Sequence, residues 1–299
     1  MIMKKYSSIY SRAIVLTFVL CISSFVYGEV INGINYSLDK GANTASVIAD
    51  ANNKYSGDIV IPKAVTYGGK EYKVTSISDQ AMSHCSGITS VKIPESVVRI
   101  GADAFYACTK LTSIDIPNSV TIIGGWAFNQ CSALASVTLP NSLKKIEGYM
   151  FTYCKSLKSV VIPNSVTSIG AYAFSECESL TSVTISESVT YIDNYVFYNC
   201  NNLKTVINMS VTPQLAFSST FSVFGELHVP EGCKDVYAES AIWKHFTDIT
   251  DNPENPTAIT AVKVSDDKAN NSTYSLTGQR VSSSSKGLVI TRGTKVIRR

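Results

Sequence analysis

Apolar and polar positions repeat along the middle of the chain with a constant step of 23 residues. The clearest unit runs from Leu111 to Cys131, where Leu111, Ile114 and Ile116 alternate with polar residues until Pro117. This alternation predicts a short strand, because successive side chains of a strand point to opposite faces.

The second half of the unit predicts a turn back towards the next strand. Val120 and Ile123 favour a second short extended piece, and Gly124 and Gly125 permit a tight corner. The Ala127–Phe128 segment predicts a short helical turn.

Phenylalanine, cysteine and proline positions keep the same step. The recurring cysteines are Cys85, Cys108, Cys131, Cys154, Cys177 and Cys200. The recurring phenylalanines are Phe105, Phe128, Phe151, Phe174 and Phe197. One unit cannot enclose its own apolar residues, but stacked units cover one another at about 4.8 Å. A period of 20–29 residues is typical of a leucine-rich-repeat solenoid.

The unit resembles the BspA-type leucine-rich repeat, which runs Leu-x-x-Val-x-Ile-Pro-x-Ser-Val-x-x-Ile-Gly-x-x-Ala-Phe-x-x-Cys. The fold expected is therefore an α/β repeat solenoid: a right-handed superhelix of 23-residue units with short parallel strands and short helical turns. The entry segment, with an insertion near Thr66–Tyr72, resembles the amino-terminal cap of that family. Leu227–Pro230 is expected to be the last strand, and Lys234–Phe246 resembles the closing helix.

Six segments follow from these patterns. They are a signal peptide (1–28), a cap with irregular first repeats (29–87), five regular repeats (88–202), irregular last repeats with a cap helix (203–250), a polar linker (251–270) and a basic tail (271–299).

The amino terminus has the order of a secretory signal peptide: Lys4 and Lys5, an apolar run over Ala13–Ile22, and small residues up to Gly28. Cleavage after Gly28 would leave Glu29 first. The apolar core is shorter than the ~20 residues of a membrane span, and we expect no transmembrane segment in the mature chain. Lipid attachment at Cys21, as in a lipoprotein, is disfavoured because the bulky Leu20 precedes it.

The net charge of +3 comes from the three cations of residues 1–28, so the mature chain is neutral. Neutrality argues against a nucleic-acid partner. The tail is basic and resembles a shortened carboxy-terminal sorting domain of Bacteroidetes-type secreted proteins; the alternative is a small β-hairpin with a basic end. Its six cations are Arg280, Lys286, Arg292, Lys295, Arg298 and Arg299.

The recurring cysteines are interpreted as buried, apolar structural thiols. Disulfides between neighbouring units remain an alternative, because the distance between units would permit them. The spacing does not suit a metal site, and no cofactor is expected.

Catalytic groups do not converge in the sequence, so we predict a protein that is not an enzyme. His84 lies beside Cys85, which is expected to face the core, so the pair is interpreted as accidental. The alternative is a secreted hydrolase or glycan-processing accessory with its site at an irregular end, around His228, Glu231 and His245.

Two surface columns are candidate binding sites. The first is a strand-face column, in which Val161 also lies: Lys92, Asp115, Thr138 and Thr184. The second is an aromatic stripe, named so throughout: Trp126, Tyr149, Tyr172 and Tyr195. Exposed aromatic side chains can anchor a partner, although these rings could instead lie flat on the adjacent unit.

The sequence therefore predicts an exported, non-enzymatic binding or adhesion protein, secreted or associated with the cell surface or outer membrane. The resemblance implies a host matrix protein or a cell-surface protein as partner. The aromatic stripe, if exposed, would also suit a glycan. A structural envelope protein that self-associates is a further alternative.

Overall fold

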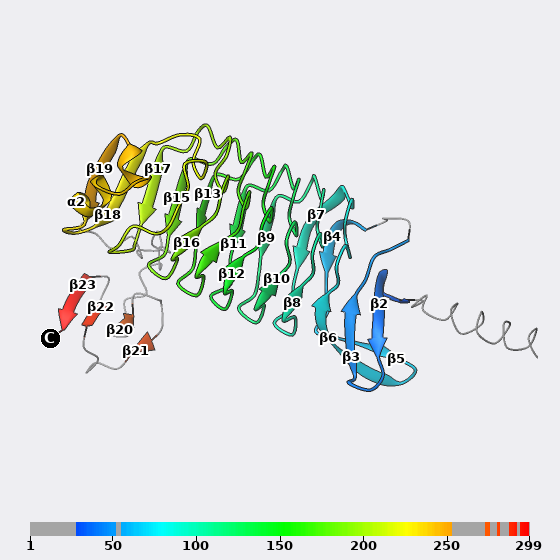
Figure 1. Cartoon of the computed structure of the whole chain (residues 1–299). Coiled ribbons are helices and arrows are strands. Elements are labelled where there is room, and N and C mark those ends of the chain that lie inside the picture. The colour runs from blue at the N-terminus through cyan, green and yellow to red at the C-terminus, as the bar shows by residue number, and fades with distance from the viewer. Residues whose placement is uncertain are drawn as a thin grey trace, which may run out of the picture.

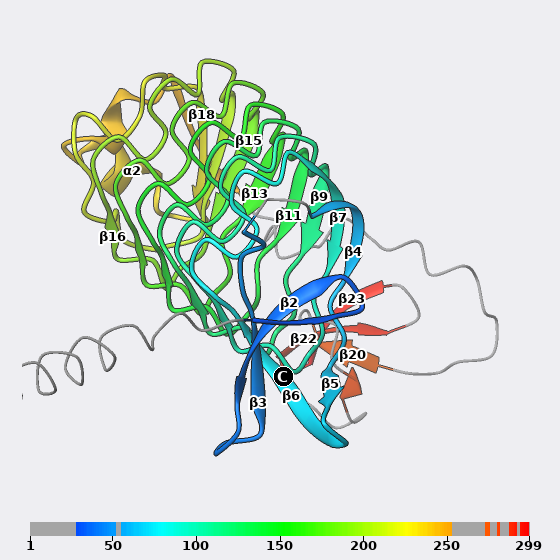
Figure 2. The ribbon, with the colours of Figure 1, turned by 90° about the vertical axis from the view of Figure 1, so that its right-hand side faces the viewer.

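The computed structural model describes residues 28–51 and 55–252, and the backbone of four strands between residues 273 and 298. Up to residue 252 the chain forms an elongated solenoid whose rungs stack along one axis (Figure 1). Seen after a quarter turn, successive rungs lie behind one another (Figure 2). The expected signal peptide and most of the expected linker fall outside the described residues.

One face of the solenoid carries the first strand of each rung, in a four-stranded and a five-stranded parallel sheet. The four-stranded sheet contains β4 (Ser56–Val60), β7 (Gly87–Lys92), β9 (Ser113–Asp115) and β11 (Ser136–Thr138). The five-stranded sheet contains β13 (Ser159–Val161), β15 (Ser182–Ile185), β17 (Thr205–Asn208), β18 (Glu226–Pro230) and β19 (Asp248–Asn252). In the regular rungs neighbouring strands pair in the 23-residue register, as Ser136 with Ser113, whereas the strands at the two ends pair with other steps.

A second face carries the second strand of each rung, which has only two residues in the regular rungs. It contains β6 (Lys70–Ile77), β8 (Arg99–Ile100), β10 (Ile122–Ile123), β12 (Lys145–Ile146), β14 (Ser168–Ile169) and β16 (Tyr191–Ile192). At the amino-terminal end, β3 (Thr44–Val47) pairs with β6 in parallel. Beyond it, β2 (Ile34–Asp39) and β1 (Glu29–Ile31) continue the sheet in antiparallel fashion. These strands cover the edge that the first rung would otherwise leave open.

The insertion predicted near Thr66–Tyr72 forms a β-hairpin between β5 (Ala64–Tyr67) and β6. Gly68 and Gly69 connect the strands with φ angles of 58° and 76°. A two-residue hairpin loop of this kind needs positive φ at both positions, which glycine adopts without a steric penalty.

The α/β class is not confirmed. Among the described residues, helix occurs only at α2 (Lys234–Ala238) and at the 3-10 turn η1 (Trp243–His245), both near the carboxy-terminal end. The expected helical turn at Ala127–Phe128 is a non-helical corner. The residues that flank the corner, Trp126 and Gln130, have left-handed φ angles of 62° and 60°. A left-handed residue cannot continue a right-handed helix.

Left-handed residues recur at two positions of six consecutive corners, and none of them is a glycine. The first position holds Gln80, Asp103, Trp126, Tyr149, Tyr172 and Tyr195. The second position holds His84, Ala107, Gln130, Tyr153, Glu176 and Asn199. Gly124 does not have a positive φ; a β-carbon there would lie 2.4 Å from the backbone nitrogen of Ala102 in the preceding rung. This glycine therefore permits close approach between rungs.

Alternate backbone N–H groups of each corner donate to carbonyl groups of the next rung. The bond from Trp126 to Gly148 measures 3.3 Å, and that from Phe128 to Met150 measures 2.9 Å. Gln130 donates to Thr152 at 2.8 Å. The corner is therefore a third hydrogen-bonded side of the solenoid, and it is as firmly fixed to its neighbours as the two sheets.

The core is a stack of phenylalanine rings beneath the corners. Phe151 lies 5.3 Å from Phe128 and 5.3 Å from Phe174, measured between ring centroids, with nearly parallel planes. The stack reaches Phe221 through Phe197, at a centroid distance of 5.2 Å. These rings are buried, so their regular spacing couples the stability of each rung to its neighbours.

The carboxy-terminal end departs from the expected order. Leu227–Pro230 lies in β18, but β19 follows it in the same sheet, so β18 is not the last strand. The expected closing helix is divided into α2 and η1. Trp243 packs edge-on against Phe221 at 5.5 Å, and its indole N–H donates to the carbonyl of Gln214 at 3.0 Å. Aromatic side chains thus cover the end of the phenylalanine stack.

The tail contains a separate four-stranded antiparallel sheet in the order β21-β20-β22-β23. Its strands are β20 (Thr273–Ser275), β21 (Arg280–Val281), β22 (Gly287–Thr291) and β23 (Thr294–Arg298). The likeness of this segment to a sorting domain remains a prediction.

Replacing Phe151 by Ala is expected to lower the free energy of unfolding by about 3–5 kcal/mol, because the change removes a buried ring between two stacked neighbours. Denaturant unfolding followed by circular dichroism measures the loss. Val161→Ala is the control: its side chain is 64% exposed, so we expect a change within about 0.5 kcal/mol. Equal unfolding curves for both variants would contradict the ladder assignment.

Replacing Ala107 by Gly is expected to raise stability by about 0.5–1 kcal/mol, because Ala107 has a φ of 57° and carries the steric cost of the left-handed region. Ala104 lies in the same corner, is fully buried and lacks a positive φ. Ala104→Gly should therefore destabilise the protein by about 1 kcal/mol or more. Thermal and denaturant melting of both variants tests the pair; a loss in both would refute the assigned corner conformation.

Candidate binding surface

The aromatic stripe lies on the corner side of the solenoid, at the first left-handed position of four consecutive rungs. Each ring comes directly before two buried apolar residues of the corner, the second of which is phenylalanine, as Trp126 precedes Ala127 and Phe128. The side chains of the stripe therefore point outward while the phenylalanine two positions later is buried. The structure thus brings together the four residues that the sequence predicts as one column.

The rings of the stripe stack face to face. The centroid distance is 4.2 Å from Trp126 to Tyr149, 4.8 Å from Tyr149 to Tyr172 and 4.7 Å from Tyr172 to Tyr195. Trp126 is 40% exposed. The two middle rings have both faces covered by neighbours, so they offer their edges and hydroxyl groups to solvent.

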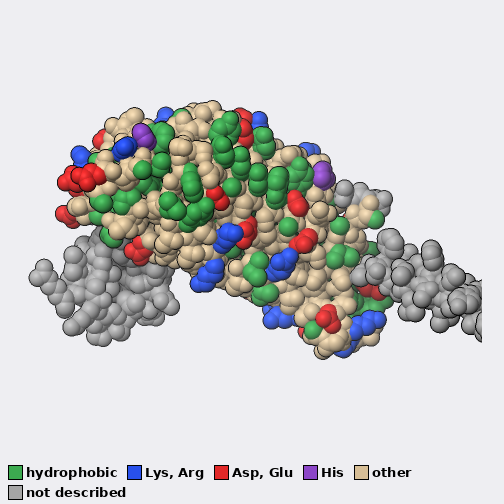
Figure 3. Space-filling view, in the orientation of Figure 1, with side chains coloured by type: hydrophobic (Ala, Val, Ile, Leu, Met, Phe, Trp, Pro, Cys, Tyr) green, Lys and Arg blue, Asp and Glu red, His purple; other side chains and the backbone are tan. Residues whose placement is uncertain are grey.

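The phenol of Tyr172, in the middle of the stripe, is harder to ionise than a free phenol. Desolvation, followed by the neighbouring phenols of Tyr195 and Tyr149, raises the pKa of Tyr172 above its ordinary value. The stripe therefore combines apolar ring edges with uncharged hydrogen-bonding groups. In the space-filling view, hydrophobic side chains gather in a band along the rungs, with charged side chains mainly below the band and at its ends (Figure 3).

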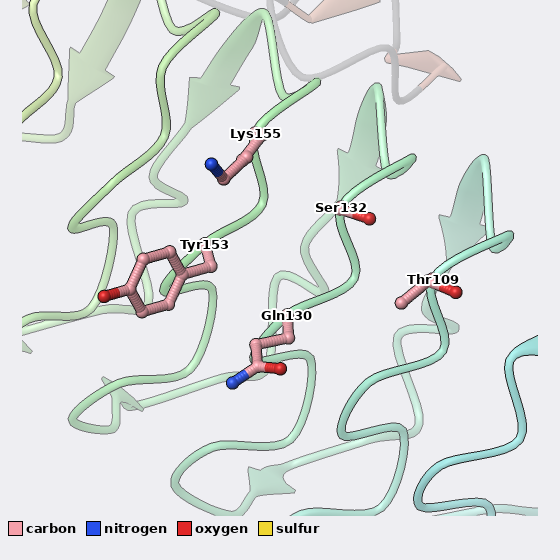
Figure 4. A pocket seen from close by; sticks show the side chains of 5 residues that line it. All are labelled: Thr109, Gln130, Ser132, Tyr153 and Lys155. Carbon is pink, nitrogen blue, oxygen red and sulfur yellow. The ribbon is translucent and has the colours of Figure 1, made fainter.

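A shallow groove of about 250 Å³ lies on the same corner side and was not predicted from the sequence. Its lining comes from three consecutive rungs (Figure 4): Thr109, Gln130, Ser132, Tyr153 and Lys155. The 23-residue step could have revealed this groove, because it aligns Gln130 with Tyr153, and Thr109 with Ser132 and Lys155. The groove was not predicted because residues of different chemical types alternate in these columns.

The strand-face column is exposed as predicted from strand alternation. Lys92 pairs in register with Asp115, and Asp115 with Thr138. Thr184 is half-buried and pairs with Val161. The buried neighbours along the same strands, such as Val91 and Ile114, face the core.

A column of serines adjoins the strand-face column and ends beside a carboxylate. Its members are Ser90, Ser113, Ser136, Ser159 and Ser182. The hydroxyls of Ser90 and Thr89 donate to Asp58 at 2.6 and 2.8 Å. These hydrogen bonds, that of Ser90 first, lower the pKa of Asp58. The strand face thus offers mainly small polar groups and few large side chains, and a carboxylate satisfies two of its hydroxyls at one end.

The alternative enzymatic cluster does not form from the residues expected. His228 Nδ1 lies 2.8 Å from the hydroxyl of Thr250, and its Nε2 lies 3.6 Å from Glu226. His245 instead packs against Phe224 with ring centroids 5.6 Å apart. Thr250 comes beside His228 only through the pairing of β18 with β19, which the sequence does not reveal. Glu226 lies two residues before His228 on the same strand, so strand alternation was the signal that could have found it.

The cysteine ladder consists of free thiols in the described residues. The thiol of Cys131 donates to the carbonyl of Phe105 at 3.2 Å, and that of Cys154 to Phe128 at 3.3 Å. Burial raises the pKa of Cys131 to about 12 and that of Cys154 well above the ordinary value. These thiols therefore stabilise the packing between rungs and are not nucleophiles.

His84 and Cys85 point to different surroundings. The His84 ring packs edge-on against Tyr106 at 5.0 Å, and its Nδ1 lies 3.0 Å from the Ser83 hydroxyl. Cys85 is buried and donates to the carbonyl of Ser83. The two residues are not a reactive pair.

Within residues 28–51 and 55–252 and the described tail strands, no group of three or more His, Cys, Asp or Glu side chains could hold a metal ion. The same part of the chain has no helix of the length and hydropathy that crossing a bilayer requires.

Comparison with known proteins supports the repeat assignment. The family model described as the BspA type leucine rich repeat region matches residues 75–204 in six copies. The crystal structure of a leucine-rich repeat protein from T. pallidum is similar, with 30% sequence identity and a TM-score of 0.52. The match covers 59% of this chain and 83% of that protein.

Two further solved structures are similar at lower identity. A leucine-rich cell surface protein from Faecalibacterium prausnitzii is 20% identical, with 77% of this chain and 96% of that chain covered and a TM-score of 0.39. The pneumococcal vaccine antigen PcpA is 15% identical, with 76% and 99% covered and a TM-score of 0.34. A search of curated proteins gives no match.

Among the described cysteines, Cys233 is expected to be the one that reacts rapidly with a thiol reagent, because it alone is partly exposed. The six ladder thiols should react only as fast as the native fold opens. Titration with a chromogenic disulfide in native buffer measures the fast fraction, and Cys233→Ser should abolish it. Rapid reaction of several thiols in the native protein would contradict the buried ladder.

Proposed function

Because this chain belongs to the BspA-type leucine-rich repeat family, we propose that it is an exported, non-enzymatic binding protein of the cell surface. Its partner is a protein of the host matrix or of another cell, bound through the aromatic stripe. Export is supported by the signal-peptide pattern of residues 1–28. The class of partner is supported by the family and by the chemistry of the stripe.

The observation that carries this proposal is the presence of large aromatic residues at a backbone position that disfavours them. Left-handed φ is uncommon for bulky residues and costs about 1–2 kcal/mol. Gln80 and Asp103 occupy the same rung position, so a polar residue satisfies the backbone there. The fold does not require four aromatic residues in a row outside the core, which favours a role in recognition.

The side chains of the stripe are pre-organised for binding. Its backbone is hydrogen-bonded to the next rung, as Tyr149 donates to Ala171 at 3.0 Å, and its rings restrict one another by stacking. The phenylalanine stack lies directly beneath it. Because these side chains lose little freedom on binding, most of their contact energy contributes to affinity.

The geometry of the rings favours a protein over a sugar at this surface. The faces of Tyr149 and Tyr172 are occupied by neighbouring rings and cannot stack on a sugar ring. Their edges and hydroxyl groups suit the mixed apolar and hydrogen-bonding contacts of protein interfaces, where Tyr and Trp are enriched.

The proposal is tested by binding of the purified exported chain to a panel of matrix proteins, mucins and host cells, measured by surface plasmon resonance and cell adhesion. In the stripe variant, Trp126, Tyr149, Tyr172 and Tyr195 are each replaced by Gln. Gln80 shows that the corner accepts this residue. We expect the stripe variant to lose at least about tenfold in affinity, as hot-spot residues do.

The matched control replaces the strand-face column Lys92, Asp115, Thr138 and Thr184 by Ala and should keep full affinity. Melting curves establish that both variants are folded. Loss of binding in the strand-face variant alone would place the site on the sheet. Absence of any protein partner for the parent chain would overturn the proposal.

A further inference from the structure

Tyr153 differs from every residue of the aromatic stripe. It occupies the second left-handed position of its corner, with a φ of 61°, and is 41% exposed. In the described part of the chain its ring stacks on no other aromatic ring and its hydroxyl makes no hydrogen bond. One face of the ring is turned towards the viewer in Figure 4, so this face and the hydroxyl are available to a ligand.

Neither the backbone nor the core requires a tyrosine at this position. Ala107 and Gln130 occupy the equivalent place in the two preceding rungs with nearly the same φ. The ring of Tyr153 lies beside the groove of about 250 Å³ and forms one of its walls (Figure 4). It is thus an apolar platform next to a concave, polar surface.

The remaining walls of the groove are hydrogen-bonding groups without net charge. The amide nitrogen of Gln130 donates to the hydroxyl of Tyr106 at 2.9 Å, which fixes the side chain and leaves its carbonyl oxygen without a donor among the described residues. The hydroxyls of Thr109 and Ser132 likewise make no hydrogen bond in this part of the chain. Each can both donate and accept.

Lys155 does not make the groove cationic, because its ammonium group is paired with Glu178 at 2.7 Å. That pairing raises the pKa of Lys155, so its ammonium group stays protonated beside the carboxylate. An anionic ligand beside Lys155 would also face the Glu178 carboxylate, which repels it. The groove therefore favours an uncharged ligand.

We propose that the groove lined by Tyr153, Gln130, Thr109, Ser132 and Lys155 is a second binding site, which takes one or two neutral sugar residues of a glycan. A pyranose presents an apolar C–H face, which fits the free ring of Tyr153, and a rim of hydroxyl groups, which fits the amide and hydroxyls around it. The volume lies just below the ~300–1,000 Å³ of drug-sized pockets, in keeping with so short a segment.

The site goes beyond the proposed protein-binding stripe and is independent of it. Tyr149 and Tyr153 belong to the same rung, but the first is stacked between two rings and the second is free. An open groove of this size gives dissociation constants of about 0.1–1 mM, as expected where few atoms are enclosed.

The test is isothermal titration calorimetry of the exported chain with neutral oligosaccharides of glucose, galactose, mannose, xylose and N-acetylglucosamine. Sulfated and uronic-acid oligosaccharides are titrated in parallel. We expect binding of at least one neutral series, with an affinity unchanged between about 0.05 and 0.5 M salt, since no net charge is engaged.

Tyr153→Ala should weaken sugar binding at least about tenfold. Ala107 shows that alanine is accommodated at this backbone position, so the variant should fold. Tyr198→Ala is the matched control: Tyr198 has a similar exposure of 40% but packs against Tyr195, outside the groove, and its loss should change the affinity less than twofold. The stripe variant should also keep full sugar affinity.

Failure of every neutral oligosaccharide to bind at about 10 mM would overturn the proposal. Binding only of anionic sugars, or unchanged binding by Tyr153→Ala, would overturn it equally. Loss of sugar binding in the stripe variant with full binding by Tyr153→Ala would move the sugar to the stripe. Binding of protein partners and binding of sugars are measured in separate experiments. A negative result for one proposal therefore does not decide the other.

Discussion

The register between rungs is the constraint on which the rest of the molecule depends. Each rung hydrogen-bonds to the next through two sheets and through the corner, and all three contacts need the same 23-residue step. The phenylalanine stack adds parallel rings 5.3 Å apart, and the thiols of the ladder cysteines from Cys108 to Cys200 donate to carbonyl groups of the preceding rung. An extra residue in one rung would break all of these contacts together, so changes in length occur towards the ends, as at the hairpin of β5 and β6.

Because of this register, residues at the same position of successive rungs lie side by side and form a continuous surface. Left-handed residues close each corner tightly and direct two side chains outward. At the first position the outward rings meet their neighbours and stack; at the second, Tyr153 stands next to Gln130 and a groove remains. The two left-handed positions of the corners thus give two surfaces of different chemistry. The first presents the edges and hydroxyls of stacked rings, and the second presents a free ring face beside uncharged polar groups.

Both ends of the solenoid are built from non-repeating sequence, because an end must bury one face without a further rung to cover it. Antiparallel strands β1–β3 close the amino-terminal side, and Trp243 with Phe246 covers Phe221 at the other. Periodicity gives no guidance in these segments. For that reason the sequence predicted a last strand one step too early and grouped His228 with Glu231 and His245, whereas the fold places it beside Thr250 and Glu226.

The sequence by itself determined the rung, its length, the buried phenylalanine and cysteine ladders, and which residues share an exposed column. These features follow from translational repetition, in which equal spacing along the chain becomes adjacency in space. Only the tertiary structure decided the left-handed corners in place of helical turns, the closed faces of the stripe and the free face of Tyr153. These depend on backbone dihedral angles and side-chain rotamers set by contacts between rungs, which residue type and spacing do not specify.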